Sequence, residues 1–326
     1  MEKLPCYIYR DGEHFTLPSK FDDSPPKLCQ FAVLDDAGRP APHPQVFRQV
    51  EKPDEAALFL FPWDIGHYVD ALMADEMEAL IRALPCYPGR ELRHIVCDGG
   101  DLTHSINIPA RLFKISLTPK NAGSAVGTWY DLPFYCANEK ASFNRQEIRY
   151  DCAFVGNITN PLRKAAILSL QHQCEGLRLK IDLDDSLYLQ DGYYFQRERT
   201  PEQLAARQRL YLDATRQSLA VLCPPGIGPH SIRMYETMHL GRVPVLFDTG
   251  AVYPFADDMD YSAFCLFIPG DRVMDTGSIL RKELAARHPE ELCEMGVLAC
   301  KTWNSRFAPE KGLPELLKAA SARYDG

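Results

Sequence analysis

An arginine and a glutamate three residues apart, Arg233 and Glu236, form a pair of side chains that could hold a nucleotide. Residues with this spacing lie on one face of a helix. The guanidinium group can pair with a diphosphate, and the carboxylate can accept hydrogen bonds from ribose hydroxyls. The same spacing is common in surface ion pairs of helices, so the surrounding segments must decide between the two interpretations.

The segment before this pair is typical of a phosphate-binding loop. A predicted strand over residues 219–223 leads into Gly226 and Gly228, and a helix is expected from Pro229, with Ser231 as its cap. Glycines let a ligand approach the backbone, and free N–H groups at a helix start attract phosphate. The residues predicted here to bind a nucleotide are Gly226, Gly228, His230, Ser231, Arg233 and Glu236.

The elements that would position these side chains alternate along the chain. A strand at 55–62, a helix at 71–84 and a strand at 94–97 are followed by a polar stretch at 137–149, after which the alternation restarts. In parallel α/β sheets, ligands bind beyond the carboxyl ends of the strands. The predicted fold class is therefore α/β, with two Rossmann-like domains facing a central cleft. We place the domains at residues 1–148 and 149–326, and expect the C-terminal helices to be candidates for packing back on the first domain.

Composition and charge narrow the function further. The chain has 326 residues and a net charge of −8, which argues against nucleic acid as the partner. Its 11 cysteines have irregular spacings without a C-x-x-C pair, so a zinc ribbon is not expected. The chain also has neither the Gly-x-Gly-x-x-Gly fingerprint of nicotinamide-binding proteins nor a Gly-x-Ser-x-Gly nucleophile elbow.

Two runs of the second half resemble the core of exostosin-type glycosyltransferases. They read Leu222-Cys-Pro-Pro-Gly-Ile-Gly-Pro-His-Ser-Ile-Arg-Met-Tyr-Glu-Thr-Met-His-Leu-Gly-Arg-Val-Pro-Val-Leu-Phe247 and Tyr253-Pro-Phe-Ala-Asp-Asp-Met-Asp-Tyr-Ser-Ala-Phe264. Upstream, Phe154-Val-Gly-Asn157 together with Arg163 resembles the strand–glycine–helix segment of the same family. Weaker resemblances lie at 7–10, 54–62 and 95–100, and the sequence departs from the family pattern at Ile227.

The resemblance implies a GT-B fold and a nucleotide-sugar donor, most naturally a UDP-sugar, bound by the second domain. It also implies transfer with inversion and without a metal or other cofactor. Arg233 would meet the diphosphate and Glu236 the ribose, and Gly156 and Arg163 would join the donor site.

Inversion is a single displacement, in which a base takes the proton of the acceptor hydroxyl while the nucleoside diphosphate leaves. We expect this base in the first domain, opposite the donor, in loops at the carboxyl ends of strands. Turn and helix-cap roles, which are common for Asp beside Gly, stay open for each candidate. The candidate catalytic residues are Asp64, His67, Asp98, Asp101 and the charge-stabilising Arg233, with His104 close by.

Two other functions stay open. Asp182-Leu-Asp184 follows an apolar strand and would suit the metal site of the other glycosyltransferase architecture, in which case manganese would be required. A non-catalytic nucleotide-sugar or glycan-binding subunit of a polysaccharide synthase would retain the donor loop. The position of the candidate bases relative to the donor discriminates that subunit from an enzyme.

The expected partners are a nucleotide sugar and a glycan or lipid-linked glycan acceptor. No run of about 18 apolar residues occurs that would span a membrane, and the N-terminus lacks the apolar stretch of a signal peptide. We therefore expect a cytoplasmic protein engaged in bacterial surface polysaccharide synthesis, with peripheral contact to the inner face of the membrane as an open option.

Overall fold

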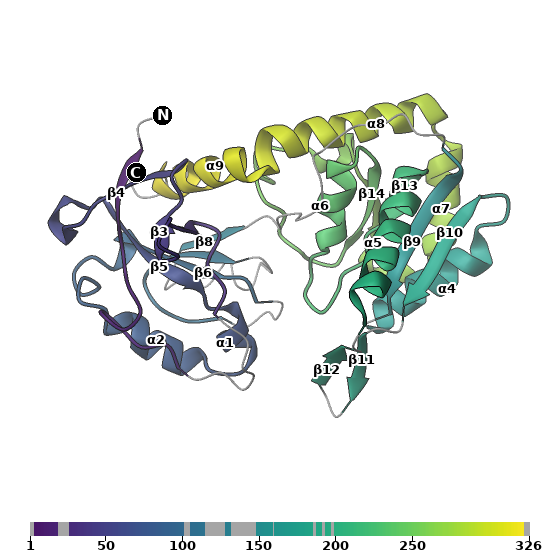
Figure 1. Cartoon of the computed structure of the whole chain (residues 1–326). Coiled ribbons are helices and arrows are strands. Elements are labelled where there is room, and N and C mark those ends of the chain that lie inside the picture. The colour runs from purple at the N-terminus through teal and green to yellow at the C-terminus, as the bar shows by residue number, and fades with distance from the viewer. Residues whose placement is uncertain are drawn as a thin grey trace. The chain divides into compact units, whose positions relative to one another are not determined.

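The computed structural model shows two compact units (Figure 1). The first comprises residues 1–133, 250–255 and 309–326, and the second comprises residues 134–249 and 256–308. The residues that the structure describes are 3–18, 26–100, 105–114, 128–131, 148–158, 160–184, 187–190, 193–196 and 199–322.

The first unit contains a six-stranded sheet in the order β4-β1-β5-β6-β7-β8, in which every neighbouring pair is parallel. In Figure 1, α1 and α2 lie below this sheet and α9 lies above it. The strands are β1 (Leu4–Ile8), β4 (Phe47–Gln49), β5 (Leu58–Asp64), β6 (His94–Asp98), β7 (Arg111–Lys114) and β8 (Thr128–Asp131). The other elements are the antiparallel pair β2 (Ala32–Leu34) and β3 (Pro40–Pro42), the short helices η1 (Pro53–Glu55) and η2 (Glu91–Arg93), and the helices α1 (Gly66–Asp70), α2 (Ala74–Arg82) and α9 (Pro309–Ala322).

The core of the first unit explains why β5 is a continuous apolar run. Phe59 and Phe61 point into one hydrophobic cluster with Met77 and Ile81 of α2. A parallel strand covered on both faces has no solvent side, so its sequence does not alternate.

The predicted helix over 71–84 is wrong at its start, because α2 begins at Ala74. Leu72 adopts φ 63°, in the left-handed region, and such a residue cannot continue a right-handed helix. The turn that it makes separates α1 from α2 and leaves the Leu72 side chain exposed.

The second unit contains a five-stranded parallel sheet in the order β10-β9-β13-β14-β15. Its strands are β9 (Tyr150–Asn157), β10 (Leu179–Asp184), β13 (Ser218–Leu222), β14 (Val243–Asp248) and β15 (Leu266–Pro269), and β11 (Leu187–Gln190) pairs with β12 (Tyr193–Gln196). Its helices are α4 (Pro161–Gln173), α5 (Pro201–Arg216), α6 (Ile232–His239), η3 (Tyr261–Ala263), η4 (Gly270–Asp275), α7 (Thr276–Ala285), α8 (Pro289–Thr302) and the π-helix η5 (Trp303–Phe307).

Both faces of this sheet are covered by helices. Phe154 packs in the large cluster to which α4, α7 and α8 contribute, whereas its neighbours Ala153 and Val155 pack with Ala214 of α5. Successive residues of a strand point to opposite faces, so β9 serves both layers. The two parallel sheets with their helices confirm the predicted α/β class with two Rossmann-like units, which are the components of the GT-B fold.

The elements β15 and α7 were not predicted from the sequence, and the start of α6 was predicted three residues too early. Ser231 has the extended backbone angles of a capping residue, φ −127° and ψ 116°, so Pro229 and His230 lie before the helix. Most of the polar stretch at 137–149 lies outside the described residues.

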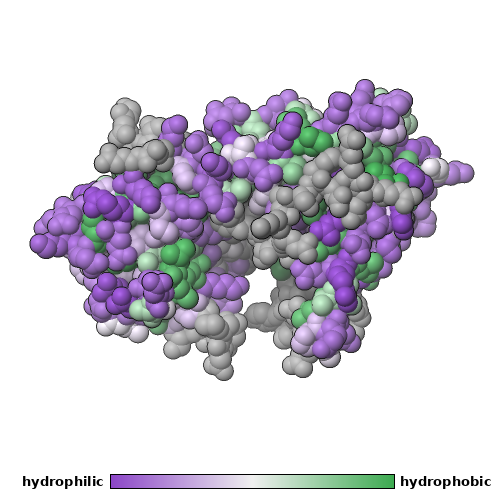
Figure 2. All heavy atoms as spheres, turned by 45° about the horizontal axis from the view of Figure 1, so that its top comes forward, coloured by the Kyte–Doolittle hydropathy of each residue, from purple (hydrophilic) through white to green (hydrophobic). Residues whose placement is uncertain are grey.

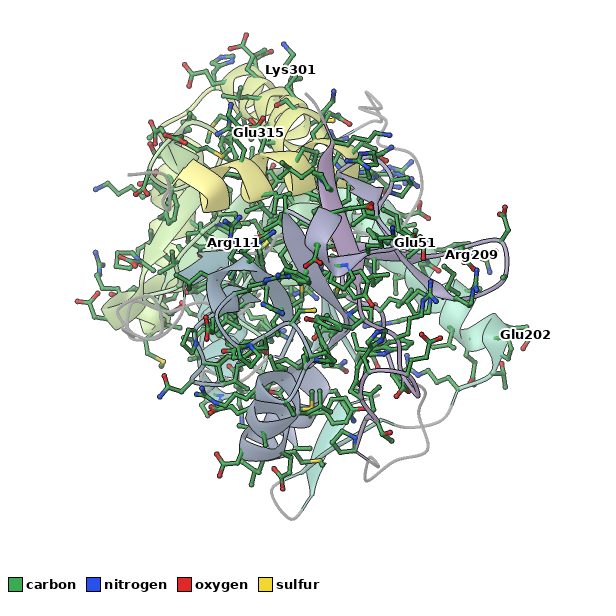
Figure 3. The ribbon with its side chains drawn as sticks, turned by 90° about the vertical axis from the view of Figure 1, so that its left-hand side faces the viewer. Glu51, Arg111, Glu202, Arg209, Lys301 and Glu315 are labelled. Carbon is green, nitrogen blue, oxygen red and sulfur yellow. The ribbon has the colours of Figure 1, made fainter. Side chains whose placement is uncertain are left out.

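Among the residues coloured in Figure 2, hydrophilic ones predominate on the visible surface, with smaller hydrophobic areas between them. Figure 3 shows Glu202, Arg209 and Lys301 projecting from the ribbon, and all three are exposed. Within the described part of the chain, no helix is both long and apolar enough to cross a membrane.

Candidate nucleotide-sugar site

The predicted nucleotide-binding residues of the second unit gather at the carboxyl ends of β9 and β13. The loop over 223–231 leaves β13 and ends at α6, whose first two turns carry Arg233 and Glu236. The chain from β9 into α4 supplies Gly156 and Arg163 to the same region. Strand ends meet at one edge of a parallel sheet, and this edge is where such folds bind ligands.

Arg233 is held in one orientation by three contacts. Its Nη2 donates a hydrogen bond to the Val155 carbonyl at 3.0 Å. Its guanidinium carbon lies 4.6 Å from the centre of the Phe154 ring and 5.8 Å from that of Tyr211. The Nε atom is buried and has no hydrogen-bond partner among the described residues, so the cation keeps unused donor capacity.

Gly156 makes room for this guanidinium group. A Cβ atom at position 156 would lie 2.5 Å from Arg233 Nη2, which is closer than real Cβ contacts come. Any side chain there would displace the arginine. The sequence resemblance placed Gly156 in the donor site, and the geometry shows that its neighbour is Arg233.

Glu236 is half-buried and receives a hydrogen bond from a residue that sequence analysis missed. Tyr211 on α5 donates from its hydroxyl to Glu236 Oε2 at 2.6 Å. Burial raises the pKa of Glu236, while the Tyr211 hydrogen bond and the positive charges of Arg233 and His239 oppose the rise. Tyr211 lies 25 residues before Glu236, and no motif in the sequence joins the two.

Arg163 braces the loop that precedes α6. Its side chain is buried, and it donates from Nη1 to the Asn157 carbonyl at 3.0 Å and from Nη2 to the Pro224 carbonyl at 3.2 Å. These bonds tie the end of β9 to the loop after β13. Arg163 therefore shapes the loop, in addition to bringing a positive charge to it.

Asn160 supports the same connection and was also missed. Its side-chain oxygen caps α4 by accepting from the Arg163 N–H at 2.8 Å. Its amide nitrogen donates to the Pro225 carbonyl at 3.2 Å and also to the Gly226 carbonyl. An Asn followed by Pro161 at the first helical position is a capping signal that sequence analysis could have used.

The remaining loop residues lie close by. His230 and Gly228 are buried, and Gly226 is half-buried, with its N–H bonded to the His230 carbonyl at 3.3 Å. Ser231 occupies the cap position of α6, but its side chain makes no capping hydrogen bond. The loop thus folds back on itself beside the first residues of α4 and α6.

In the first unit, Asp64 lies at the carboxyl end of β5. Its Oδ1 accepts from the N–H groups of Gly66 at 2.8 Å and Gly99 at 2.7 Å. Burial raises the pKa of Asp64 to about 6, and the charge of Asp98 adds to the rise, while the two N–H groups and Lys114 oppose it. A carboxyl with this pKa can exchange a proton near neutral pH.

Asp98 lies at the end of β6 and is fully buried with its ion-pair partner. Lys114 Nζ lies 3.0 Å from Asp98 Oδ2, and neither side chain is exposed to solvent. The Ser105 hydroxyl donates to the same oxygen at 2.5 Å, and the Gly100 N–H donates to Oδ1 at 3.0 Å. Both oxygens are therefore occupied by the protein.

The other candidate bases differ in what the structure shows. His67 is exposed on α1, two residues after Ile65. Asp101 and His104 lie outside the described residues. Among the candidates that the structure describes, Asp64 and Asp98 are brought together at neighbouring strand ends, β5 being paired with β6.

Asp182 and Asp184, the Asp-x-Asp candidate for a metal, are engaged by arginines. Arg207 pairs with Asp182 and, through Nε, with Asp184 Oδ2 at 3.0 Å, and Arg199 pairs with both oxygens of Asp184. Bidentate arginine contacts occupy the lone pairs that a cation would need. Within the described residues, no group of three or more His, Cys, Asp or Glu side chains could hold a metal ion.

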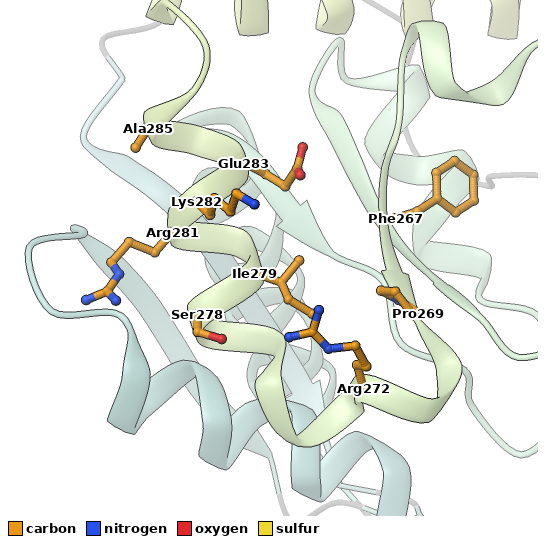
Figure 4. A pocket seen from close by; sticks show the side chains of 9 residues that line it. All are labelled: Phe267, Pro269, Arg272, Ser278, Ile279, Arg281, Lys282, Glu283 and Ala285. Carbon is orange, nitrogen blue, oxygen red and sulfur yellow. The ribbon is translucent and has the colours of Figure 1, made fainter.

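A groove of about 760 Å³ lies elsewhere on the second unit, along α7 and β15 (Figure 4). Its lining includes Phe267, Ile279 and the exposed Arg281. None of the predicted nucleotide-binding residues lines it.

The two parallel sheets, with an Arg and a Glu at the strand ends of one, define a Rossmann-like α/β protein. Residues 149–282 match the family model described as the exostosin GT47 domain. Residues 149–282 are therefore similar to the exostosin GT47 domain, in agreement with the resemblance that the sequence predicted.

Proteins similar to the chain include one curated relative and two of the matching solved structures. A protein of Arabidopsis thaliana named "Probable glycosyltransferase" is 33% identical over 70 residues, which are 22% of this chain and 14% of that protein. Anabaena HepE in complex with UDP-glucose has a TM-score of 0.47 and 11% identity, covering 82% of this chain and 79% of its own. Sucrose-phosphate synthase from Thermosynechococcus elongatus has a TM-score of 0.47 and 9% identity, covering 99% and 100%. These values are low, so the fold assignment rests on the strand order of the chain itself.

Proposed function

We propose that the protein transfers a sugar from a nucleoside diphosphate donor, most naturally a UDP-sugar, to a hydroxyl of a glycan. The observation that carries the proposal is the Arg233–Glu236 pair, held by Phe154, Val155 and Tyr211 at the strand ends of an exostosin GT47 domain. A fixed cation beside a partly open carboxylate matches a diphosphate joined to a ribose.

The transfer that we propose inverts the anomeric carbon and needs no metal. Arg233 and the N-terminus of α6 would stabilise the charge that develops on the leaving diphosphate. The guanidinium group is already fixed by its ring and carbonyl contacts, so little reorganisation is required when charge develops.

Asp64 is the base that we propose for the acceptor hydroxyl. The pKa of about 6 leaves it ionised at neutral pH and yet basic enough to take a proton. Asp98 is the weaker candidate, because Lys114, Ser105 and a backbone N–H already occupy its oxygens. We assign Asp98 the role of fixing the strand end beside Asp64.

For the acceptor we propose a glycan or lipid-linked glycan in bacterial surface polysaccharide synthesis, which is the acceptor expected from the sequence for a cytoplasmic transferase. We propose that any contact of the protein with the inner face of the membrane is peripheral. The exostosin domain supports the glycosyl transfer itself.

A thermal-shift screen tests the proposal, using UDP, GDP, CMP and dTDP with their sugars, each with and without EDTA. We expect stabilisation by one nucleoside diphosphate that survives chelation, since ligand binding to the native state raises the melting temperature. Stabilisation that needs a divalent ion would contradict metal independence. No stabilisation by any nucleotide would contradict the donor site.

The variant Glu236→Ala gives the test at residue level. We expect its nucleotide affinity to fall by about 1.5–3 kcal/mol in calorimetry, because a charged hydrogen-bond acceptor for the ribose is removed. Folding should be retained, as the carboxylate is only half-buried. Unchanged affinity would remove Glu236 from the site.

A further inference from the structure

We propose that Tyr211 is a positioning residue of the nucleotide site, whose hydroxyl orients the Glu236 carboxylate so that Oε1 accepts the ribose hydroxyls. The role rests on the proposed function, because it takes a nucleoside diphosphate as the ligand of Glu236. Tyr211 does not touch the ligand in this role and acts only through Glu236.

The contact geometry supports this role. The Tyr211 hydroxyl donates to Glu236 Oε2 at 2.6 Å, and no other hydrogen bond to the Glu236 side chain is found among the described residues. An ionised carboxylate has two accepting oxygens, so one of them stays available when the other is held. The short hydrogen bond to a charged acceptor favours one rotamer of the Glu236 side chain, which could otherwise rotate about three bonds.

Tyr211 also contacts the other half of the pair. The centre of its ring lies 5.8 Å from the guanidinium carbon of Arg233. One side chain thus touches both residues with different parts, the hydroxyl for Glu236 and the ring for Arg233. The substitution Tyr211→Phe therefore removes the first contact and keeps the second.

The groups around Glu236 determine in which direction its pKa changes when the Tyr211 hydroxyl is removed. The groups that face it are Tyr211 from α5, Arg233 and His239 from α6, and Cys223 from the end of β13. Burial and the Glu236 charge raise the pKa of Tyr211 well above its ordinary value, so the hydroxyl remains a donor. Its hydrogen bond favours the ionised form of Glu236, and loss of the bond raises the Glu236 pKa further.

The experiment compares wild type with Tyr211→Phe by calorimetry, using UDP and 2′,3′-dideoxy-UDP. We expect the Kd for UDP to rise about tenfold, while the Kd for the dideoxy analogue stays nearly constant. The loss of UDP affinity on acidification should begin at a higher pH in the variant. In turnover assays the KM for the donor should rise and kcat should change little, because Arg233 keeps its ring contact.

Two further variants make the outcomes distinct. Tyr150→Phe removes a tyrosine hydroxyl at the amino end of β9 in the same unit, and it should leave both affinities unchanged. Glu236→Ala should abolish the preference for UDP over the dideoxy analogue.

Each result decides between the two proposals. A wild-type protein that binds neither nucleotide overturns the proposed function and the role of Tyr211 together. A ribose preference that Glu236→Ala loses and Tyr211→Phe retains overturns only the role of Tyr211. A Tyr211→Phe variant that fails to fold, or melts lower with its ribose preference intact, identifies a purely structural tie between α5 and α6 and also overturns the role.

Discussion

Each unit places an acidic and a basic side chain at the carboxyl ends of its parallel strands, but the two pairs differ in what is left unsatisfied. In the first unit, Asp98 and Lys114 are fully buried, and every oxygen of the aspartate has a protein partner. In the second, Glu236 is half-buried and Arg233 keeps a nitrogen without a hydrogen bond among the described residues. The first pair therefore has all its hydrogen bonds within the protein, whereas the second keeps hydrogen-bonding capacity, which the proposed function assigns to a nucleotide.

The comparison distinguishes two roles that a charged residue at a strand end can have, one in folding and one in binding. A buried ion pair with all its hydrogen bonds made contributes to a unique local structure, and removal of one partner leaves an uncompensated charge. A partly open pair contributes less to folding and keeps its charge for binding. This difference can be tested by substitution, and the largest effect is expected in the first unit.

The variant Lys114→Met should break the complete pair. We expect the free energy of unfolding to fall by about 3–5 kcal/mol, because Asp98 would stay buried without its cation. Urea denaturation measures the change. The matched control is Lys180→Met, which removes a half-exposed lysine 3.7 Å from Asp182 and should cost less than about 1 kcal/mol. Equal effects of the two substitutions would contradict the distinction between the pairs.

The variant Arg233→Ala should break the open pair and act mainly on catalysis. We expect turnover to fall because the activation free energy rises by about 2–4 kcal/mol, as it does on loss of a donor that stabilises developing charge. Steady-state kinetics with the donor identified by thermal shift measures the loss. The control is Arg209→Ala, at an exposed position of α5, and it should leave turnover unchanged (Figure 3). Near-normal turnover of Arg233→Ala would leave Arg233 with only its packing role over Phe154.

The pH profile of the wild-type enzyme sharpens the comparison within the first unit. Burial raises the folded-state pKa of Asp64 to about 6, so the carboxyl is protonated below that pH and cannot act as a base. We expect kcat/KM to fall about tenfold for each pH unit below the pKa. Asp64→Asn should remove most of the activity and with it this acid limb, whereas an unchanged limb in the variant would assign it to another group.

Sequence reasoning anticipated the parts of this molecule that depend on neighbours along the chain. The apolar strands over 55–62 and 94–97 and the glycine loop before Arg233 follow from local patterns. The break at Leu72 escaped prediction because a left-handed residue other than glycine has no strong signature in the sequence. The start of α6 at Ile232 was missed because proline is favoured at the first helical position, which the sequence analysis assigned to Pro229. The short strand β15 has only four residues, too few for a periodicity to be read.

By itself the sequence determined the α/β class, the position of Arg233 and Glu236 on one helix face, and the resemblance that the exostosin GT47 match supports. Only the tertiary structure decided which acidic side chains have protein hydrogen-bond partners on both oxygens and which have a partner on one oxygen only. Tyr211 reaches Glu236 from another helix, and Lys114 reaches Asp98 from another strand. Such pairings depend on how parallel strands bring their ends together, and the spacing of residues along the chain carries no information about them.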